Sequence, residues 1–204
     1  YLKPDYLLIT NLSRDSIMRN AHPEYIANFL TDNIPKDTML VLNADDLISS
    51  NVAKDNKRVY YGISRMDTDR TDCINLINDF QICPKCHQKL RYNYLRYNHI
   101  GNAYCPDCDF KSPDADFLGI NVNTSAMTME VKNGDEVIGY KLLNESVHHI
   151  YNVVAVVGGG SVTVALAMAR AIRDGNENYN LTIIYSSMSK RDILCFDALS
   201  DVIV

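Results

Sequence analysis

Four cysteines in two matched pairs offer the clearest chemistry in this chain. They form the motifs Cys83-Pro-Lys-Cys86 and Cys105-Pro-Asp-Cys108, with eighteen residues between the pairs. Two C-x₂-C motifs at this spacing are typical of a Cys₄ zinc ribbon, in which each motif supplies two thiolates to one tetrahedral Zn²⁺. Such a site has no open coordination position, so we predict a structural metal at these four cysteines. Two disulfides or a redox motif are the alternatives, but no secretory signal is visible and a redox C-x-x-C normally occurs singly.

The segment between the two cysteine pairs predicts a strand or hairpin. Residues 90–97 alternate tyrosine and leucine with polar residues, which is the period of a half-buried strand. Interleaved arginine and tyrosine also suit stacking on nucleic-acid bases. A non-catalytic zinc-ribbon binding module is therefore an alternative function, and its contact residues would be Arg91, Tyr92, Tyr94, Arg96 and Tyr97. We favour tyrosines that cover the small core of the ribbon.

Two clusters of polar residues follow predicted strands. The first runs from Asn11 to Asp15 and the second from Asn43 to Asp46, after the apolar runs at residues 6–10 and 38–43. In an open α/β sheet, ligands bind beyond the carboxyl ends of the strands. An asparagine amide suits an adenine edge, and paired aspartates suit a ribose, a cation or a substrate amine. Both clusters are equally compatible with simple helix caps.

The overall composition narrows the class of protein. The chain has 204 residues, is 47% hydrophobic and carries a net charge of −5. A core of one or two domains is therefore expected, whereas the basic footprint of a nucleic-acid-binding protein is absent. No run of eighteen apolar residues predicts a membrane span. Cys73 and Cys195, outside the paired motifs, fit a reducing environment, so we expect a cytoplasmic protein.

The order of the predicted elements indicates an α/β fold. A strand at 6–10, a helix at 22–30 and strands at 38–43 and 59–63 predict a mainly parallel sheet with helices. The ribbon follows as an insertion at about 80–113. After it, the sequence predicts antiparallel strands at 117–122, 128–131 and 137–140, with Asn133-Gly134 as the turn of a hairpin.

The last third of the chain predicts further α/β material. Residues 148–157 fit a helix or a strand equally well from their pattern. A helix at 162–173 and a strand at 181–185 follow Gly158-Gly159-Gly160. We therefore expect two domains, one at 1–157 with the inserted ribbon and a partial C-terminal α/β domain at 158–204.

These motifs together resemble the Mur ligase superfamily, and within it the MurT-like ligases. Residues 9–15 resemble the strand end "NLFRDQ" of that family, and residues 41–46 resemble its "LNADDP". Residues 150–152 are similar to the helix that closes the central domain, and residues 191–197 to a stretch of the C-terminal domain. A Cys₄ ribbon inserted in the central domain separates MurT-like proteins from other Mur ligases.

The resemblance implies a fold, an activity and partners. The fold would be a Mur ligase central domain with the inserted ribbon and part of a C-terminal domain. The activity would be ATP-dependent amidation of the D-glutamate in the lipid II stem peptide, with Mg²⁺ and an acyl-phosphate intermediate. Ammonia would come from a GatD-like glutamine amidotransferase subunit, and lipid II would be met at the membrane surface.

The resemblance also implies roles for individual residues. Asn43 would contact adenine, Asp46 would support the nucleotide pocket, and Asn152 would lie near the same nucleotide. Asn11 and Asp15 would face the phosphates and the acyl acceptor.

One catalytic residue is implied as well. Asp197 would approach the amidotransferase partner, because it matches an aspartate-containing stretch of the C-terminal domain.

The chain departs from the family pattern at several positions. The phosphate loop "GTNGKTT" would precede residue 1, so we expect this chain to be part of a longer protein. Ser16 stands where Gln or His is usual, Met18 where Asp is usual, and Leu47 where Pro is usual. A degenerate Mur-type scaffold that binds a partner without nucleotide is the remaining alternative.

Overall fold

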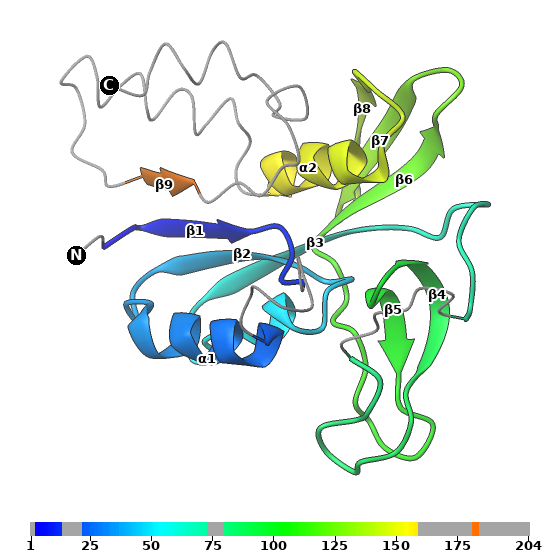
Figure 1. The fold of residues 1–204 in the computed structure, drawn as a ribbon. Coiled ribbons are helices and arrows are strands. Elements are labelled where there is room, and N and C mark those ends of the chain that lie inside the picture. The colour runs from blue at the N-terminus through cyan, green and yellow to red at the C-terminus, as the bar shows by residue number, and fades with distance from the viewer. Residues whose placement is uncertain (1–2, 14–21, 73–79, 159–180, 184–204) are drawn as a thin grey trace, which may run out of the picture.

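The computed structural model describes residues 3–13, 22–72, 80–158 and 181–183. Its main body is a seven-stranded sheet, and a separate two-stranded sheet projects from it (Figure 1). The strands of the main sheet, in sequence order, are β1 (Tyr6–Ile9), β2 (Met39–Asn43), β3 (Arg58–Ile63), β6 (Phe117–Asn123), β7 (Thr128–Asn133), β8 (Glu136–Lys141) and β9 (Leu181–Ile183). The remaining elements are α1 (Pro23–Asn33), the 3₁₀ turn η1 (Ser49–Asn51), β4 (Arg91–Tyr97), β5 (Ile100–Tyr104) and α2 (Val147–Gly158).

The main sheet is parallel over five strands and antiparallel at one edge. Its order is β8-β7-β6-β3-β2-β1-β9, with parallel pairing from β9 to β6 and antiparallel pairing of β6 with β7 and of β7 with β8. The mainly parallel α/β fold and the antiparallel strands predicted after the ribbon are thus confirmed. Gly134, at a φ of +58°, occupies the tight turn between β7 and β8 that the sequence predicted.

Helices cover the two faces of the sheet, which explains the continuous apolar runs in its strands. Leu40 and Leu42 of β2 point to one face and pack in a cluster that includes Leu30 of α1. Val41 points to the other face and packs in the cluster that includes Val154 of α2. Figure 1 shows α1 and α2 on opposite sides of the sheet.

Residues 147–158 resolve the choice between helix and strand that the sequence pattern left open. They form α2, and most of the residues of this helix are buried. A helix that is buried on nearly all sides has apolar residues on nearly all sides. The backbone of Ile150 already donates to Ser146, so the helical hydrogen bonds begin at its first turn. No helix among the described residues is long and apolar enough to cross a membrane.

The predicted insertion lies between β3 and β6. Strands β4 and β5 form an antiparallel hairpin, and short bridges at Ile82–Lys89 and Tyr104–Lys111 extend it beyond each strand. Its small core contains Cys83 and Cys105 together with apolar side chains. We call residues 80–113 the ribbon from here on.

The C-terminal segment contributes one described strand to the same sheet. β9 pairs in parallel with β1, the N-terminal strand (Figure 1). The helix predicted at 162–173 lies outside the described residues. The division into domains at 157 and 158 therefore stays a prediction.

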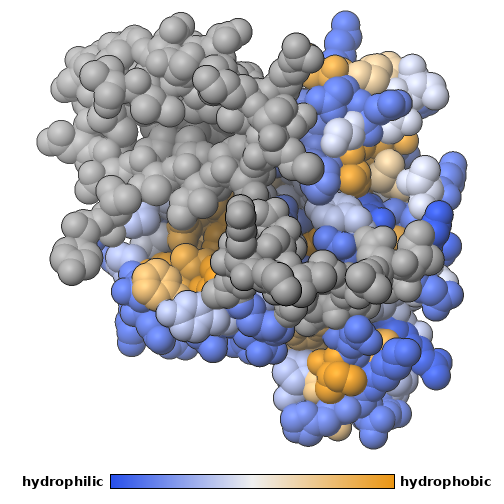
Figure 2. Space-filling model, in the orientation of Figure 1, coloured by the Kyte–Doolittle hydropathy of each residue, from blue (hydrophilic) through white to orange (hydrophobic). Residues whose placement is uncertain are grey.

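The face of the molecule drawn in Figure 2 is largely hydrophilic over the described residues, with separate hydrophobic areas. Among the residues that the structure describes, the exposed large apolar side chains are Tyr6, Tyr25, Phe29, Ile82, Val137, Ile138 and Leu143.

The contact of α2 with β6 predicts a steric effect at Gly119. A Cβ at this position would lie 2.9 Å from Cγ2 of Val154, and a valine offers little room to move. We expect Gly119→Ala to lower the free energy of unfolding by about 1–3 kcal/mol, because overpacking displaces α2. Urea unfolding followed by circular dichroism measures the change. Gly139→Ala is the control, since a Cβ there meets nothing within 4 Å; equal effects of the two substitutions would contradict the packing.

Candidate functional site

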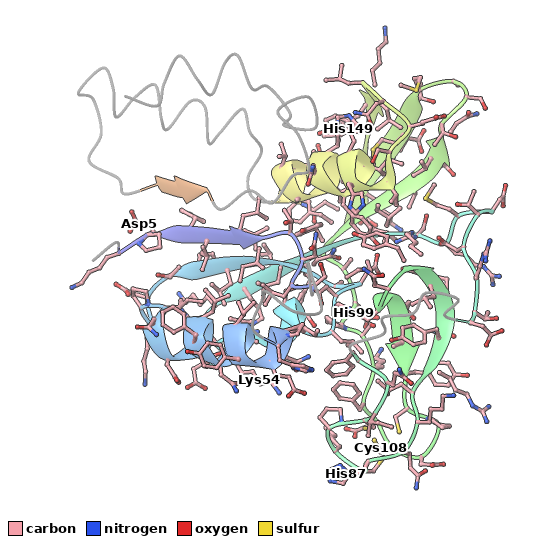
Figure 3. All side chains as sticks on the ribbon, in the orientation of Figure 1. Asp5, Lys54, His87, His99, Cys108 and His149 are labelled. Atoms are coloured by element: carbon pink, nitrogen blue, oxygen red, sulfur yellow. The ribbon has the colours of Figure 1, made fainter. Side chains whose placement is uncertain are left out.

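The carboxyl ends of β1, β2 and β3 meet at the edge of the sheet that faces the ribbon. Asn43 ends β2 and residues 44–46 follow it at this edge, and all four of them are buried. We call residues 43–46 the aspartate loop. Figure 3 places His99, at the turn of the β4–β5 hairpin, beside this edge of the sheet, while His87 and Cys108 lie at the far end of the ribbon.

Asn43 links the ends of β1 and β2. Its Nδ2 donates to the Thr10 carbonyl at 3.1 Å, and its Oδ1 accepts the Asp45 backbone N–H at 3.0 Å. The hydroxyl of Tyr61 donates to the same Thr10 carbonyl at 3.1 Å. Asn43 is thus not a helix cap, because the next helical element, η1, begins only at Ser49. Its contact with adenine stays a prediction.

Asp46 joins three segments of the chain. Its Oδ2 accepts the Leu12 N–H at 2.7 Å, and its Oδ1 accepts the Ile48 N–H at 2.9 Å. The same Oδ1 lies 3.0 Å from Nε2 of His99, and both side chains are fully buried. Burial by itself raises the pKa of Asp46, but the hydrogen bond and charge of His99, with the Leu12 amide, outweigh burial and lower the pKa below its usual value.

Asp45 is the most connected carboxylate of the aspartate loop. Its Oδ2 accepts from Nη1 of Arg96 at 2.8 Å, from the hydroxyl of Tyr151 at 2.7 Å and from the Ile63 N–H at 3.2 Å. Its Oδ1 accepts from the hydroxyl of Tyr94 at 2.8 Å. These partners come from β3, β4 and α2, so one carboxylate ties the ribbon and the closing helix to the sheet edge.

Arg96 reaches from the ribbon into this edge with a side chain that is only 2% exposed. Besides Asp45, it donates from Nη2 to the Ile63 carbonyl at 2.9 Å, to the Ser64 carbonyl at 2.6 Å and to Asp69 at 3.1 Å. Burial lowers the pKa of Arg96, but Tyr151, Asp45 and Asp69 outweigh burial and raise the pKa above its ordinary value. The guanidinium is therefore permanently charged in its buried position.

Three tyrosines around this pair are held in their protonated form. Burial, with a further contribution from the charge of Asp45, raises the pKa of Tyr94 and of Tyr151. Burial, with the charge of Asp46, likewise raises the pKa of Tyr97. Protonated hydroxyls donate to carboxylates, which is the role that Tyr94 and Tyr151 have at Asp45.

The structure corrects the interpretation of the β4 side chains. In the alternative function, Arg96 and Tyr94 would contact protein or RNA, yet they face Asp45 in the interior. Tyr92 donates to the Phe80 carbonyl at 2.9 Å and packs in the ribbon core. Sequence reasoning missed His99, because a lone histidine beside an asparagine gives no signal of a partner 53 residues away.

The other predicted site residues are placed as follows. Asn11 is half-buried on the loop after β1, and Asn152 is buried on α2. The role of Asn152 near a nucleotide stays a prediction. Asp15 and Asp197 lie outside the described residues, and their roles stay predictions.

The four predicted metal ligands converge at the tip of the ribbon. The sulfur atoms of Cys83, Cys86, Cys105 and Cys108 all lie within 4.8 Å of one another. Sγ of Cys83 is 3.5 Å from Sγ of Cys108, and Sγ of Cys86 is 3.3 Å from Sγ of Cys105. Each close pair joins one motif to the other, and all four cysteines are free of disulfides. The pairs do not match the bond of about 2 Å that a disulfide requires.

The cluster fits a tetrahedral metal in geometry and chemistry. Zn–S distances of about 2.3 Å place the sulfur atoms of a tetrahedron about 3.8 Å apart, close to the observed spacing. Burial raises the pKa of the Cys83 thiol, but the N–H groups of Cys86 and Lys85 and the neighbouring thiols outweigh burial and lower the pKa to about 7. The Lys85 N–H lies 3.4 Å from the Cys83 sulfur. Four cysteine sulfur atoms in this arrangement are a donor set for Zn²⁺.

Comparison with known structures defines the class of fold. The structure of a pseudomurein peptide ligase type C from Methanothermus fervidus matches 85% of this chain with a TM-score of 0.62 and 25% sequence identity. The match covers 34% of that protein. The fold is thus similar to part of a Mur-ligase-like peptide ligase.

Curated relatives narrow the similarity. The subunit MurT of the glutamine-hydrolysing lipid II isoglutaminyl synthase of Staphylococcus aureus is 30% identical over 141 residues, which is 63% of this chain and 31% of that protein. The MurT subunit of Streptococcus pneumoniae is 26% identical over 161 residues, which is 77% of this chain and 35% of that protein. No family model matches. The predicted resemblance to MurT-like Mur ligases is confirmed, over a chain that spans about a third of the length of these relatives.

The lowered pKa of Asp46 predicts a dependence of stability on pH. The native state favours the ionised form of Asp46, so this carboxylate contributes to the free energy of unfolding. The contribution is complete above the pKa that Asp46 has in the unfolded state, about 4, and is lost as the pH falls toward its lower pKa in the native state. We expect the free energy of unfolding of the unaltered protein to exceed that of Asp46→Asn at neutral pH, and the difference to narrow below about pH 4. Urea unfolding from pH 7 to pH 3 measures it.

Asp114→Asn is the matched control for this measurement. Its carboxylate is 92% exposed beside Lys111 and contributes little at any pH. A difference between Asp46→Asn and the unaltered protein that stays constant from pH 7 to pH 3 would contradict the assignment.

Proposed function

We propose that this chain is the Mur-type central part of an ATP-dependent amide ligase of the MurT kind. The similarity to MurT carries the proposal, because it is accompanied by a Mur-ligase-like fold in the same chain. The reaction would amidate the D-glutamate of the lipid II stem peptide. Ammonia would come from a GatD-like glutamine amidotransferase subunit.

The nucleotide would bind at the carboxyl edge of the sheet, next to the aspartate loop. Asn152 supports this placement, because it is buried on α2 next to Tyr151, whose hydroxyl donates to Asp45 of the aspartate loop. Asn43 retains a second Nδ2 hydrogen beyond its bond to Thr10, and that hydrogen would meet adenine. Asp46 would act through the backbone of Leu12, which it holds in place beside Asn11.

The chemistry would proceed in two displacements. A carboxylate oxygen of D-glutamate attacks the γ-phosphorus of ATP, the bond to ADP breaks, and an acyl phosphate forms. Ammonia then attacks the acyl carbon, inorganic phosphate leaves, and the nitrogen loses a proton. Such phosphoryl transfer depends on positioning and on charge stabilisation by Mg²⁺. Asn11 and Asp15 would face the phosphates and the acyl acceptor, and Asp197 would approach the amidotransferase.

The cysteine cluster would hold one structural Zn²⁺. Four sulfur donors leave no open position, so the metal would supply folding free energy to the ribbon and take no part in the reaction.

Binding of ATP tests the proposed nucleotide site. We expect Asn152→Ala in the full-length protein to weaken ATP binding about tenfold in calorimetry with Mg²⁺, because a lost hydrogen bond to a ligand is worth about 1–1.5 kcal/mol. Asn28→Ala, on the exposed side of α1, should leave the affinity unchanged. Equal affinities for all three proteins would contradict the placement. Partner binding without any ATP binding would favour a degenerate scaffold instead.

Metal analysis tests the zinc proposal. We expect about one Zn²⁺ per purified chain, and we expect Cys83→Ser to lose the metal and to unfold the ribbon. Lys85→Ala is the control within the same motif, because its ammonium pairs with exposed Asp109 at 2.9 Å and is not one of the four clustered ligands. Full zinc content in Cys83→Ser would exclude a Cys₄ site.

A further inference from the structure

We propose that the ribbon shapes the nucleotide site. Two of its side chains, Arg96 and His99, are positioning residues for the aspartate loop. The inference rests on the proposed function, since it assigns the loop to nucleotide binding. It gives the ribbon a role beyond holding a metal: the hairpin β4–β5 fixes the conformation of Asp45 and Asp46, and through them the backbone that would meet the ligand.

The first contact joins the ribbon to Asp45. Nη1 of Arg96 donates to Oδ2 of Asp45 at 2.8 Å, and the hydroxyl of Tyr94 donates to Oδ1 at 2.8 Å. The Gly101 N–H of the opposite strand donates to the Asp45 carbonyl at 2.8 Å. Both strands of the hairpin therefore hold the same residue, through its side chain and its backbone.

The second contact joins the ribbon to Asp46. Nε2 of His99 lies 3.0 Å from Oδ1 of Asp46, and both side chains are fully buried. The carboxylate in turn holds the N–H groups of Leu12 and Ile48 at 2.7 and 2.9 Å. A ribbon side chain thereby determines where the loop after β1 lies, and Asn11 is on that loop.

The burial of these pairs distinguishes them from ordinary surface contacts of the ribbon. The side chains of Arg96 and Asp45 are 2% and 3% exposed, whereas the Lys85–Asp109 pair of the same ribbon is 54% and 82% exposed. A buried ion pair gives little net stability, yet removing one partner leaves an uncompensated charge. Such pairs fix a conformation more than they add stability, which fits a positioning role.

Two buried nitrogens strengthen this interpretation. Nε of Arg96 and Nδ1 of His99 have no hydrogen-bond partner among the residues that the structure describes. Buried polar atoms are nearly always satisfied, so two exceptions on the two side chains that hold the loop mark a functional region. They are not needed for the contacts with Asp45 and Asp46, which use other nitrogens.

The position of the cysteine cluster completes the argument. The cysteines flank β4 and β5 and lie at the end of the ribbon away from the sheet, while His99 lies at the near end (Figure 3). The cluster fixes the base of the hairpin, and the hairpin tip fixes the aspartate loop. Retention of the metal should therefore favour nucleotide binding, and by linkage nucleotide should favour retention of the metal.

Nucleotide affinity and amide exchange of the full-length protein test the proposal together. We expect Arg96→Met and His99→Phe to weaken ATP binding at least tenfold, and to speed hydrogen exchange at Leu12, Ile48 and Ile63, whose N–H groups bond to the two aspartates. Lys85→Met should change neither quantity. His99→Gln should recover most of the affinity, because its amide can donate to Asp46 in place of Nε2.

The outcomes separate the inference from the function on which it rests. Circular dichroism and melting temperature identify any variant that fails to fold, and His99→Leu and Arg96→Lys then take its place. Affinity equal to that of the unaltered protein in folded Arg96→Met and His99→Phe would overturn the positioning role alone, even if exchange were faster. A lack of ATP binding by the unaltered protein would overturn the proposed function and this inference with it.

Discussion

The buried ion pair between Arg96 and Asp45 is the interaction on which the arrangement of the site depends. A guanidinium and a carboxylate withdrawn from water must satisfy each other and their remaining lone pairs and protons. They do so here by recruiting Tyr94, Tyr151 and backbone groups at the end of β3. The ribbon, the parallel sheet and α2 thus meet around one pair of charges, and none of the three can shift without leaving a charge unpaired.

The sheet determines where this pair can lie. Alternating side chains of β2 fill the cores beneath α1 and α2, so the strand is covered on both faces. The polar residues must therefore come after it, at the carboxyl edge where β1 and β3 also end. The insertion between β3 and β6 begins at this edge, where β3 ends, and its hairpin closes over the aspartate loop.

The sequence predicted those parts of the structure that depend on residues close together in the chain. Apolar runs located β1, β2 and β3, and the spacing of the cysteines located the cluster that the structure brings together. The pattern of residues 147–158 could not separate helix from strand, because a helix buried on nearly all sides has no polar stripe. The role of Arg96 could not be predicted either, because its partner lies 51 residues away and an exposed strand shows the same alternation.

A double-mutant cycle on the free energy of unfolding tests the central claim most directly. Asp45→Asn and Arg96→Met are measured singly and together by urea unfolding. Each single substitution leaves a buried partner uncompensated and should cost about 3–5 kcal/mol. The account predicts that the double variant loses less than the sum of the two, with a coupling of about 2 kcal/mol or more. Effects that add within about 0.5 kcal/mol would show that the two residues are independent and would contradict the account.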